Sequence, residues 1–186
     1  QAGMGGGSSD AASTLIALNR LWGLNLGLAE LRRIGLALGA DVPFFLCGHN
    51  AWVEGIGETI APLANDSQLP KARFVVVKPT AGLETKNIFS SPFLKRDSDS
   101  ATIAGFTASH YDFGRNDLQS VAQALCPEVT QALQWLASHG LQGKMTGSGS
   151  AVFAEIPQAI DFPSVPDGWQ IKVCENLKIH PLAGWV

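Results

Sequence analysis

The chain has 186 residues, of which 46% are hydrophobic and 16% are charged, and its formal net charge is −3 at pH 7. This is the composition of an ordinary soluble globular protein, large enough for one substantial core or two smaller ones. No apolar run approaches the roughly 18 residues that a membrane span needs. The mild acidity argues against nucleic acid as a general partner, because the phosphate backbone is bound mainly by basic side chains.

Residues 3–12 read Gly-Met-Gly-Gly-Gly-Ser-Ser-Asp-Ala-Ala. Glycines let a ligand approach the backbone closely, and a helix that starts directly afterwards points its unpaired N–H groups and its positive dipole end at the same place. The pattern therefore predicts an anion cradle, and phosphate is the anion that we expect there. A flexible glycine linker is the alternative, but a linker would not run into residues 10–22, where the apolar positions have helical spacing: Ala11, Leu15, Leu18 and Trp22.

The glycine segment does not follow either common nucleotide-binding motif. No lysine follows the glycines, and no strand precedes them in this sequence. Position 1 is Gln, Met4 is a poor candidate for an initiator, and no signal peptide pattern is present. We expect the chain to be a piece of a longer protein, cut within its nucleotide loop.

The following residues predict two more helices and a hairpin. Residues 29–38 have an amphipathic pattern that ends at Gly39. Asp41 occupies a helix N-cap position with Pro43 just inside, which predicts a short helix ending at Gly48. Residues 51–62 alternate as two short strands around the turn Gly55-Ile56-Gly57.

The polar stretch 65–71 predicts a domain boundary, giving domains over residues 1–64 and 72–186. The second domain should contain a sheet and several helices. Strands are predicted at 74–77, at both ends of 144–156 and at 170–174, and helices at 84–89, from the cap Asn116-Asp117 to 125, and at 127–140. This order suggests an antiparallel sheet with helices packed on one face, so the fold class is α+β. Cys47, Cys126 and Cys174 form no Cys-x-x-Cys motif and suit a reducing cytoplasm, and the histidines share no metal-ligand spacing.

Two glycine-rich segments, 3–9 and 147–149, would bracket a ligand from two domains. Phosphoryl transfer needs the phosphates held in line with the acceptor, a metal ion, and a group near the acceptor hydroxyl. Ser8 and Ser9 can offer a hydroxyl to Mg²⁺ or phosphate, and Asp41 can accept the acceptor proton. The alternatives are that Asp41 is a plain N-cap and that Ser148 is an ordinary turn residue. We interpret Asp10, expected in the first helical turn, as structural.

Three stretches, 3–12, 38–45 and 145–149, resemble the small-molecule kinases named for galactokinase, homoserine kinase, mevalonate kinase and phosphomevalonate kinase. Within that superfamily, four further stretches are similar to the 4-diphosphocytidyl-2-C-methyl-D-erythritol kinase family: 39–43, 55–58, 78–85 and 116–118. The resemblance covers essentially the whole chain. It implies that residues 1–64 are the remainder of a ribosomal-protein-S5-like N-terminal kinase domain, and that a ferredoxin-like α/β sandwich follows.

The resemblance also implies an activity. ATP, with Mg²⁺, would phosphorylate the 2-hydroxyl of cytidine-diphospho-methylerythritol in non-mevalonate isoprenoid biosynthesis, with Asp41 as the base or as the group that orients the hydroxyl. The ATP phosphates would lie on Ala2, Gly3, Met4, Gly5, Gly6, Gly7, Ser8 and Ser9, with Ser8 or Ser9 at the metal. The substrate cleft would be lined by Ile56, Thr85, Phe89, Gly147, Ser148 and Gly149. We also consider that two copies of the protein form a homodimer.

The family's N-terminal segment is absent from this sequence, and it would carry a lysine that partners the aspartate and the contacts to cytosine. We therefore expect residues 1–64 to be half a domain, and the 186 residues alone to be inactive and prone to association. The alternatives are another kinase of the superfamily, such as homoserine kinase, and an anion-binding module without catalysis.

Overall fold

The computed structural model describes residues 2–63, 69–157, 160, 162 and 164–185. The chain forms two compact units. The helical unit comprises residues 5–70 and 177–186, and the sheet unit comprises residues 1–4 and 71–176. The change from the helical to the sheet unit, between residues 70 and 71, lies close to the expected boundary. However, residues 1–4 belong to the sheet unit and residues 177–186 to the helical unit. The assignment of domains 1–64 and 72–186 stays a prediction.

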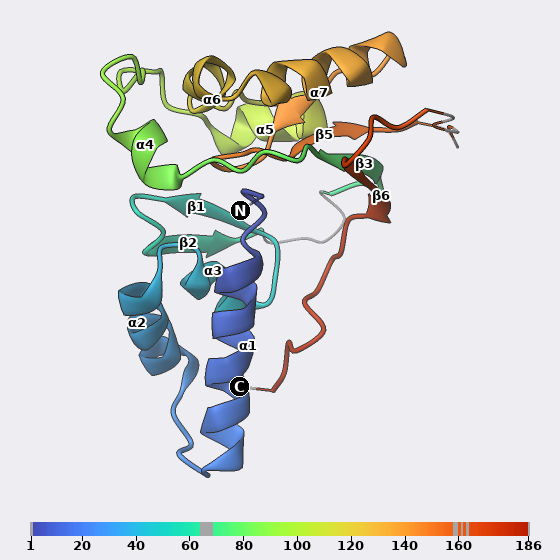
Figure 1. Cartoon of the computed structure of the whole chain (residues 1–186). Helices are drawn as coiled ribbons and strands as arrows, with labels where there is room; N and C mark the ends of the chain where they lie inside the picture. Colours follow the sequence, from blue (N-terminus) through green and yellow to red (C-terminus); the bar gives the residue numbers. More distant parts are fainter. Residues whose placement is uncertain (1, 64–68, 158–159, 161, 163, 186) are drawn as a thin grey trace. The chain divides into compact units, whose positions relative to one another are not determined.

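Among its described residues, the helical unit contains three helices and a hairpin (Figure 1). Their bounds are α1 Gly6–Leu21, α2 Leu28–Leu38, α3 Val42–Cys47, β1 Ala51–Glu54 and β2 Thr59–Pro62. The core of this unit is small and consists of Ala12, Ile16, Leu31, Val42 and Leu46. Helices α2 and α3 approach closely at Gly35, where an added Cβ would lie 2.9 Å from Cγ1 of Val42. The hairpin expected at residues 51–62 is confirmed.

The expected start of the first helix is wrong, and its inner face is only partly as predicted. Helix α1 begins at Gly6 rather than Asp10, so the last glycines and both serines form its first turn and Asp10 lies beyond that turn. Its buried side chains are Ala12, Ile16 and Asn19, while Ala11 and Leu15 of the predicted stripe pack against the same core and Trp22 is 63% exposed. The buried Asn19 amide donates to the Leu26 carbonyl (3.0 Å) and accepts from the Leu26 N–H (2.9 Å), in the connection between α1 and α2. This polar side chain is therefore hydrogen-bonded, as buried polar groups usually are.

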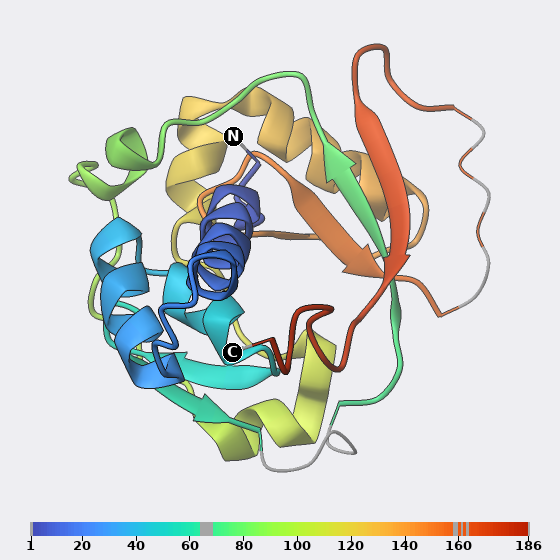
Figure 2. The same cartoon turned by 90° about the horizontal axis from the view of Figure 1, so that it is seen from below.

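The sheet unit is built on four antiparallel strands in the order β4-β5-β3-β6. Their bounds are β3 Arg73–Lys78, β4 Lys144–Met145, β5 Val152–Glu155 and β6 Gln170–Glu175. Val75 lies opposite Ala154 on one side and Val173 on the other. Strands β5, β3 and β6 lie side by side in Figure 2. The antiparallel sheet predicted for the second half of the chain is confirmed.

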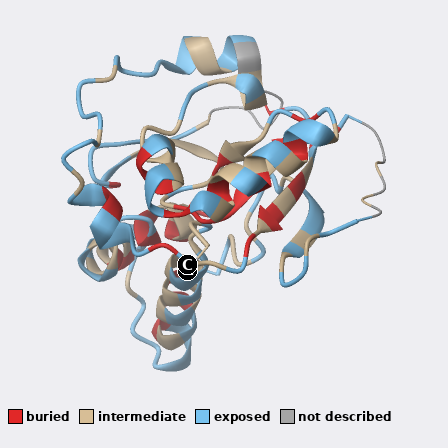
Figure 3. Ribbon diagram, turned by 45° about the horizontal axis from the view of Figure 1, so that its top comes forward, coloured by how far each residue is buried: buried red, intermediate tan, exposed pale blue. Residues whose placement is uncertain are grey.

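One face of this sheet packs against α4 Thr85–Phe89, α6 Gln119–Leu125 and α7 Pro127–Ser138. The buried residues between them include Val75, Val152, Val129 and Leu136, and buried positions are red in Figure 3. On the opposite face, Phe74 meets the ring of Tyr111 edge-on at 5.0 Å between centroids. Tyr111 belongs to a short 3₁₀ segment that directly follows helix α5, Ile103–Ser109, and the sequence analysis missed both elements.

The fold class is α+β, as expected. None of the helices in the described part of the chain combines the length and the apolar character that a membrane crossing requires.

Candidate functional site

The start of α1 is open and carries no side-chain cap. Gly5, at the N-cap, has a φ of +64° and is followed by the first helical hydrogen bond, from the Ser9 N–H to the Gly5 carbonyl at 2.8 Å. The first N–H groups of a helix have no partner within it. Gly6 and Gly7 are exposed, and a Cβ added at either would meet nothing within 4 Å. This is the arrangement that favours an anion.

The same helical turn also contains Ser8 and Ser9. Both are half-buried, and neither hydroxyl has a protein hydrogen-bond partner within the described part of the chain. No group of three or more His, Cys, Asp or Glu side chains among the described residues could hold a metal ion. Mg²⁺ typically takes one or two protein ligands together with phosphate oxygens. A lone serine hydroxyl therefore fits Mg²⁺ that arrives with a nucleotide, and the described residues do not form an all-protein cage.

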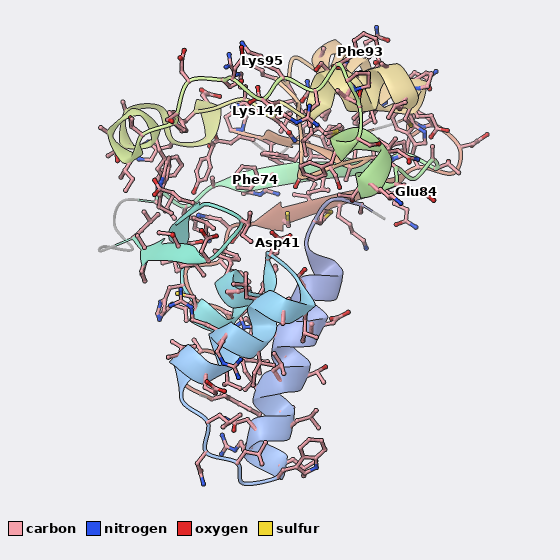
Figure 4. The ribbon with its side chains drawn as sticks, turned by 90° about the vertical axis from the view of Figure 1, so that its left-hand side faces the viewer. Asp41, Phe74, Glu84, Phe93, Lys95 and Lys144 are labelled. Carbon is pink, nitrogen blue, oxygen red and sulfur yellow. The ribbon has the colours of Figure 1, made fainter. Side chains whose placement is uncertain are left out.

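Asp41 lies at the N-cap of α3 but does not cap it. Its backbone is in the helical region (φ −85°, ψ −14°), its side chain is exposed, and its carboxylate accepts no cap hydrogen bond. Side-chain capping normally needs an extended backbone at this position, which explains why the carboxylate is left unused. Figure 4 labels it in the connection between α2 and α3. The plain N-cap alternative for Asp41 therefore loses its physical basis.

Two glycines of the helical unit lie close to neighbours of Asp41 in the sequence. A Cβ added at Gly57, whose φ is +106°, would lie 2.1 Å from the carbonyl oxygen of Ala40, so the hairpin turn packs on the peptide before Asp41. A Cβ at Gly5 would lie 3.0 Å from the ring of Phe45, one turn after Asp41. The helical unit thus gathers the start of α1, Asp41 and the turn that carries Ile56, which is 74% exposed.

The first residues of the chain lie in the sheet unit, against the turn at 147–149. The Thr146 hydroxyl donates to the Gly3 carbonyl at 2.8 Å, and the Ala151 N–H donates to the Ala2 carbonyl at 3.3 Å. A Cβ on Gly3 would lie 2.3 Å from the Thr146 carbonyl oxygen and 2.6 Å from the Gly149 nitrogen. The two glycine-rich segments therefore approach backbone to backbone, which a larger residue at Gly3 would prevent. Met4 is 53% exposed.

The predicted substrate residues of the sheet unit lie partly together. The hydroxyl oxygens of Thr85 and Ser148 are 2.7 Å apart, and either can be the donor. Gly147 and Gly149, on either side of Ser148, have φ values of +51° and +76°. Phe89 lies four residues after Thr85 at the end of α4 and is 53% exposed.

Sequence analysis missed the groups that fasten the segment before α4. The Ala81 N–H donates to the Glu128 carboxylate at 2.9 Å, while the Ala81 carbonyl accepts from the Lys78 ammonium at 2.9 Å and from the Ser150 hydroxyl. Ser150 is fully buried. Since Glu128 and Ser150 are far from Ala81 in sequence, no local pattern could have indicated these contacts. The one sequence signal that pointed to this segment was that residues 78–85 resemble the kinase family.

The expected cap of the helix after residue 116 is also different. Leu118 occupies the N-cap of α6, and Asp117 forms an ion pair with Arg115 at 3.0 Å instead of capping. The Asn116 side chain accepts from the Leu118 N–H and donates to the carbonyls of Met145 and Gly147.

The chain matches two family descriptions and several known proteins. Residues 1–49 match the GHMP kinases N terminal domain, and residues 102–165 match the GHMP kinases C terminal domain. It is 69% identical to the 4-diphosphocytidyl-2-C-methyl-D-erythritol kinase of Paracidovorax citrulli (strain AAC00-1), with 100% of this chain and 65% of the relative covered. It is 66% identical to the enzyme of the same name from Verminephrobacter eiseniae (strain EF01-2), with 100% of this chain and 67% of the relative covered.

A solved structure is also similar. The crystal structure of 4-(cytidine 5'-diphospho)-2C-methyl-D-erythritol kinase is 33% identical and has a TM-score of 0.67, covering 84% of this chain and 57% of that one. The chain spans about two thirds of the length of the curated relatives that it matches, namely 65% and 67% of the two named above.

Proposed function

Because the chain belongs to the 4-diphosphocytidyl-2-C-methyl-D-erythritol kinase family of the GHMP kinases, we propose that its protein transfers the γ-phosphoryl group of ATP to an alcohol. The acceptor is the 2-hydroxyl of 4-diphosphocytidyl-2-C-methyl-D-erythritol, in non-mevalonate isoprenoid precursor biosynthesis. The observation that carries the proposal is the uncapped start of α1, whose first turn consists of exposed Gly6 and Gly7 followed by Ser8 and Ser9. Backbone amides at a helix start are a suitable cradle for a triphosphate.

In this proposal, residues 2–9 hold the nucleotide. The N–H groups of Gly6 and Gly7 and the positive end of α1 attract the phosphate oxygens, because negative charge is stabilised at a helix start. The Ser8 or Ser9 hydroxyl would hold Mg²⁺ together with the phosphates, and the ion would neutralise negative charge on the phosphate oxygens. The chain's own contribution is position: most of the catalysis of phosphoryl transfer comes from alignment and electrostatic stabilisation.

Asp41 receives the proton of the acceptor alcohol or orients that alcohol. As the oxygen–phosphorus bond to the acceptor forms, the bond to the leaving ADP oxygen breaks, and the hydroxyl proton passes to the Asp41 carboxylate. An exposed carboxylate that is not used for capping suits this role. Ile56, on the hairpin turn that packs against the peptide before Asp41, contacts the acceptor in this proposal.

The remaining acceptor contacts come from the sheet unit. Thr85 and Ser148, whose hydroxyl oxygens lie 2.7 Å apart, can share a hydrogen-bonding group of the acceptor. Phe89 supplies an exposed aromatic surface, and Gly147 and Gly149 allow close approach to the turn between them.

The test is a substrate panel on the complete gene product. Purified protein is incubated with ATP, Mg²⁺ and one of three alcohols: the cytidine-diphospho-methylerythritol, homoserine or mevalonate 5-phosphate. Phosphorylation of the first acceptor alone supports the proposal, and preference for homoserine assigns the protein to a different branch. If none of the acceptors is phosphorylated while ATP still binds, the protein is an anion-binding module without this chemistry.

We also propose a cytoplasmic location and self-association. Cys47, Cys126 and Cys174 are all free thiols, which suits a reducing compartment. Leu21, Trp22 and Leu38 are between 62% and 77% exposed in the helical unit, and exposed apolar groups favour association. Light scattering on the eluting peak of a size-exclusion column distinguishes a homodimer from a monomer.

A further inference from the structure

Asn116 makes three hydrogen bonds from one side chain, all within the sheet unit. Its Oδ1 accepts from the Leu118 N–H at 3.0 Å, and its Nδ2 donates to the Met145 carbonyl at 3.0 Å and to the Gly147 carbonyl at 2.7 Å. The first contact is a local Asx turn. The other two join the segment before α6 to a turn about thirty positions later in the chain, which the local contact does not require.

The turn that Asn116 holds is rich in glycine. Its contacts with other segments include the Ser148–Thr85 hydroxyl pair and the hydrogen bonds of the flanking residues Thr146, Ser150 and Ala151. Gly147 and Gly149 lack side chains, and one internal hydrogen bond, from the Gly149 N–H to the Thr146 carbonyl at 2.9 Å, closes the turn. Glycine-rich segments lose more conformational freedom on ordering than other segments do. A donor that bonds two carbonyls, one on strand β4 and one within the turn, restricts that freedom directly.

We propose that Asn116 is a positioning residue for the acceptor substrate: it holds the 147–149 turn so that the Ser148 hydroxyl stays beside Thr85. This inference rests on the proposed function, in which that turn contacts the acceptor. Asn116 touches neither substrate in this proposal and acts through the turn. A turn that is ordered before binding loses less entropy when the acceptor binds. Removing the Asn116 side chain should therefore raise KM for the acceptor.

Two substitutions distinguish the positioning role of Asn116 from its role in the local Asx turn. N116A removes all three hydrogen bonds, whereas N116D keeps an acceptor for the Leu118 N–H and removes both donors. A carboxylate would also face the carbonyl oxygens of Met145 and Gly147, which repel it. We therefore expect both variants of the complete gene product to raise KM for the cytidine-diphospho-methylerythritol roughly tenfold, from two lost hydrogen bonds. KM for ATP should change by less than about threefold, since neither lost bond involves residues 2–9.

Asn176 provides a matched control in the same unit. Its side chain also both accepts and donates, from the Ala72 N–H at 2.9 Å and to the Tyr111 hydroxyl at 2.8 Å, but it lies at the end of β6, away from the predicted site residues. N176A should lower the melting temperature without raising KM for the acceptor. Amide hydrogen exchange at residues 145–149 should become faster in N116A and N116D and stay unchanged in N176A.

The outcomes are distinct. If KM for the acceptor in N116D equals that of the wild type, Asn116 is only a local turn residue and the inference is overturned. The inference also fails if KM for the acceptor and KM for ATP rise equally in the Asn116 variants. It fails as well if N176A raises KM for the acceptor as much as N116A does. These results leave the proposed function intact, because the wild-type protein still phosphorylates the acceptor. An inactive wild-type protein instead refutes the proposed function, and the inference with it.

Discussion

The Thr146 hydroxyl donates a hydrogen bond to the carbonyl oxygen of Gly3 at 2.8 Å, across 143 positions of the sequence. It joins the two glycine-rich segments that sequence analysis singled out separately. Gly3 precedes the open start of α1, and Thr146 precedes the turn at 147–149. The contact therefore holds Gly3, which belongs to the segment proposed to bind phosphate, against Thr146 within the sheet unit.

Replacing Thr146 by valine should weaken nucleotide binding. T146V keeps the shape of the side chain and removes the donor, so the Gly3 carbonyl loses a partner worth about 1 kcal/mol, or roughly a fivefold change in affinity. Calorimetric titration of the complete gene product with a non-hydrolysable ATP analogue measures the change. T107V is the control, because the Thr107 hydroxyl donates to a carbonyl within α5, away from residues 2–9. Equal affinities for wild type and T146V would show that this contact does not order the segment.

Replacing Asp41 by asparagine should abolish most turnover while leaving the fold intact. The carboxylate makes no cap hydrogen bond, so D41N should leave the melting temperature unchanged. Removing a general base typically costs a factor of about 10²–10⁴ in rate. Steady-state kinetics of the complete gene product supply kcat, and D10N is the control because Asp10 is an exposed carboxylate of the same unit. A kcat within twofold of wild type in D41N would remove Asp41 from the reaction.

A methyl group at Gly57 should disturb the peptide before Asp41. The new Cβ would lie 2.1 Å from the Ala40 carbonyl oxygen at a φ of +106°, so the hairpin turn must move. G23A is the matched control, because Gly23 also has a positive φ of +61° but its Cβ would meet nothing within 4 Å. We expect G57A to destabilise by about 1–3 kcal/mol more than G23A, as overpacking usually does. Chemical denaturation measures the difference, and similar values would mean that the turn does not pack on Ala40.

The pKa of the Tyr111 hydroxyl should be higher than that of a free tyrosine. Burial raises its pKa, and the negative charge of Glu155 raises it further, since both disfavour the phenolate. It is the only tyrosine of the sequence, so the ultraviolet absorbance of tyrosinate reports on this residue alone. The midpoint should lie higher in the folded protein than in the denatured chain, and E155Q should move it part of the way back.

The sign of the associated stability follows from the raised pKa. The unfolded chain releases the Tyr111 proton first, so this contribution is fully present below the unfolded pKa of about 10 and is lost as pH rises through the folded pKa. Alkaline unfolding of Y111F should lack this component. Coincident titration midpoints for folded and denatured chains would contradict the burial of Tyr111.

Local chemistry made several features predictable from the sequence. The hairpin at 51–62 follows from glycines between alternating strands, and α7 follows from Pro127 ahead of apolar residues at helical spacing. The stretch Gly5-Gly6-Gly7-Ser8-Ser9 indicated that a helix begins nearby, although α1 starts four positions earlier than expected. Its role in binding phosphate stays a prediction. Each of these depends on neighbours within a few positions.

What the sequence could not decide depends on contacts between distant segments. Asn116 read as a helix cap, yet its amide bonds the carbonyls of Met145 and Gly147. Asn19 is buried on the inner face of α1, where it bonds the backbone of Leu26, although the sequence analysis did not place it there. A side-chain amide has the same donors and acceptors wherever it stands, and only the folded chain determines which backbone groups come within reach. Residue types thus determined the kind of chemistry, and tertiary packing chose the partners that hold it in place.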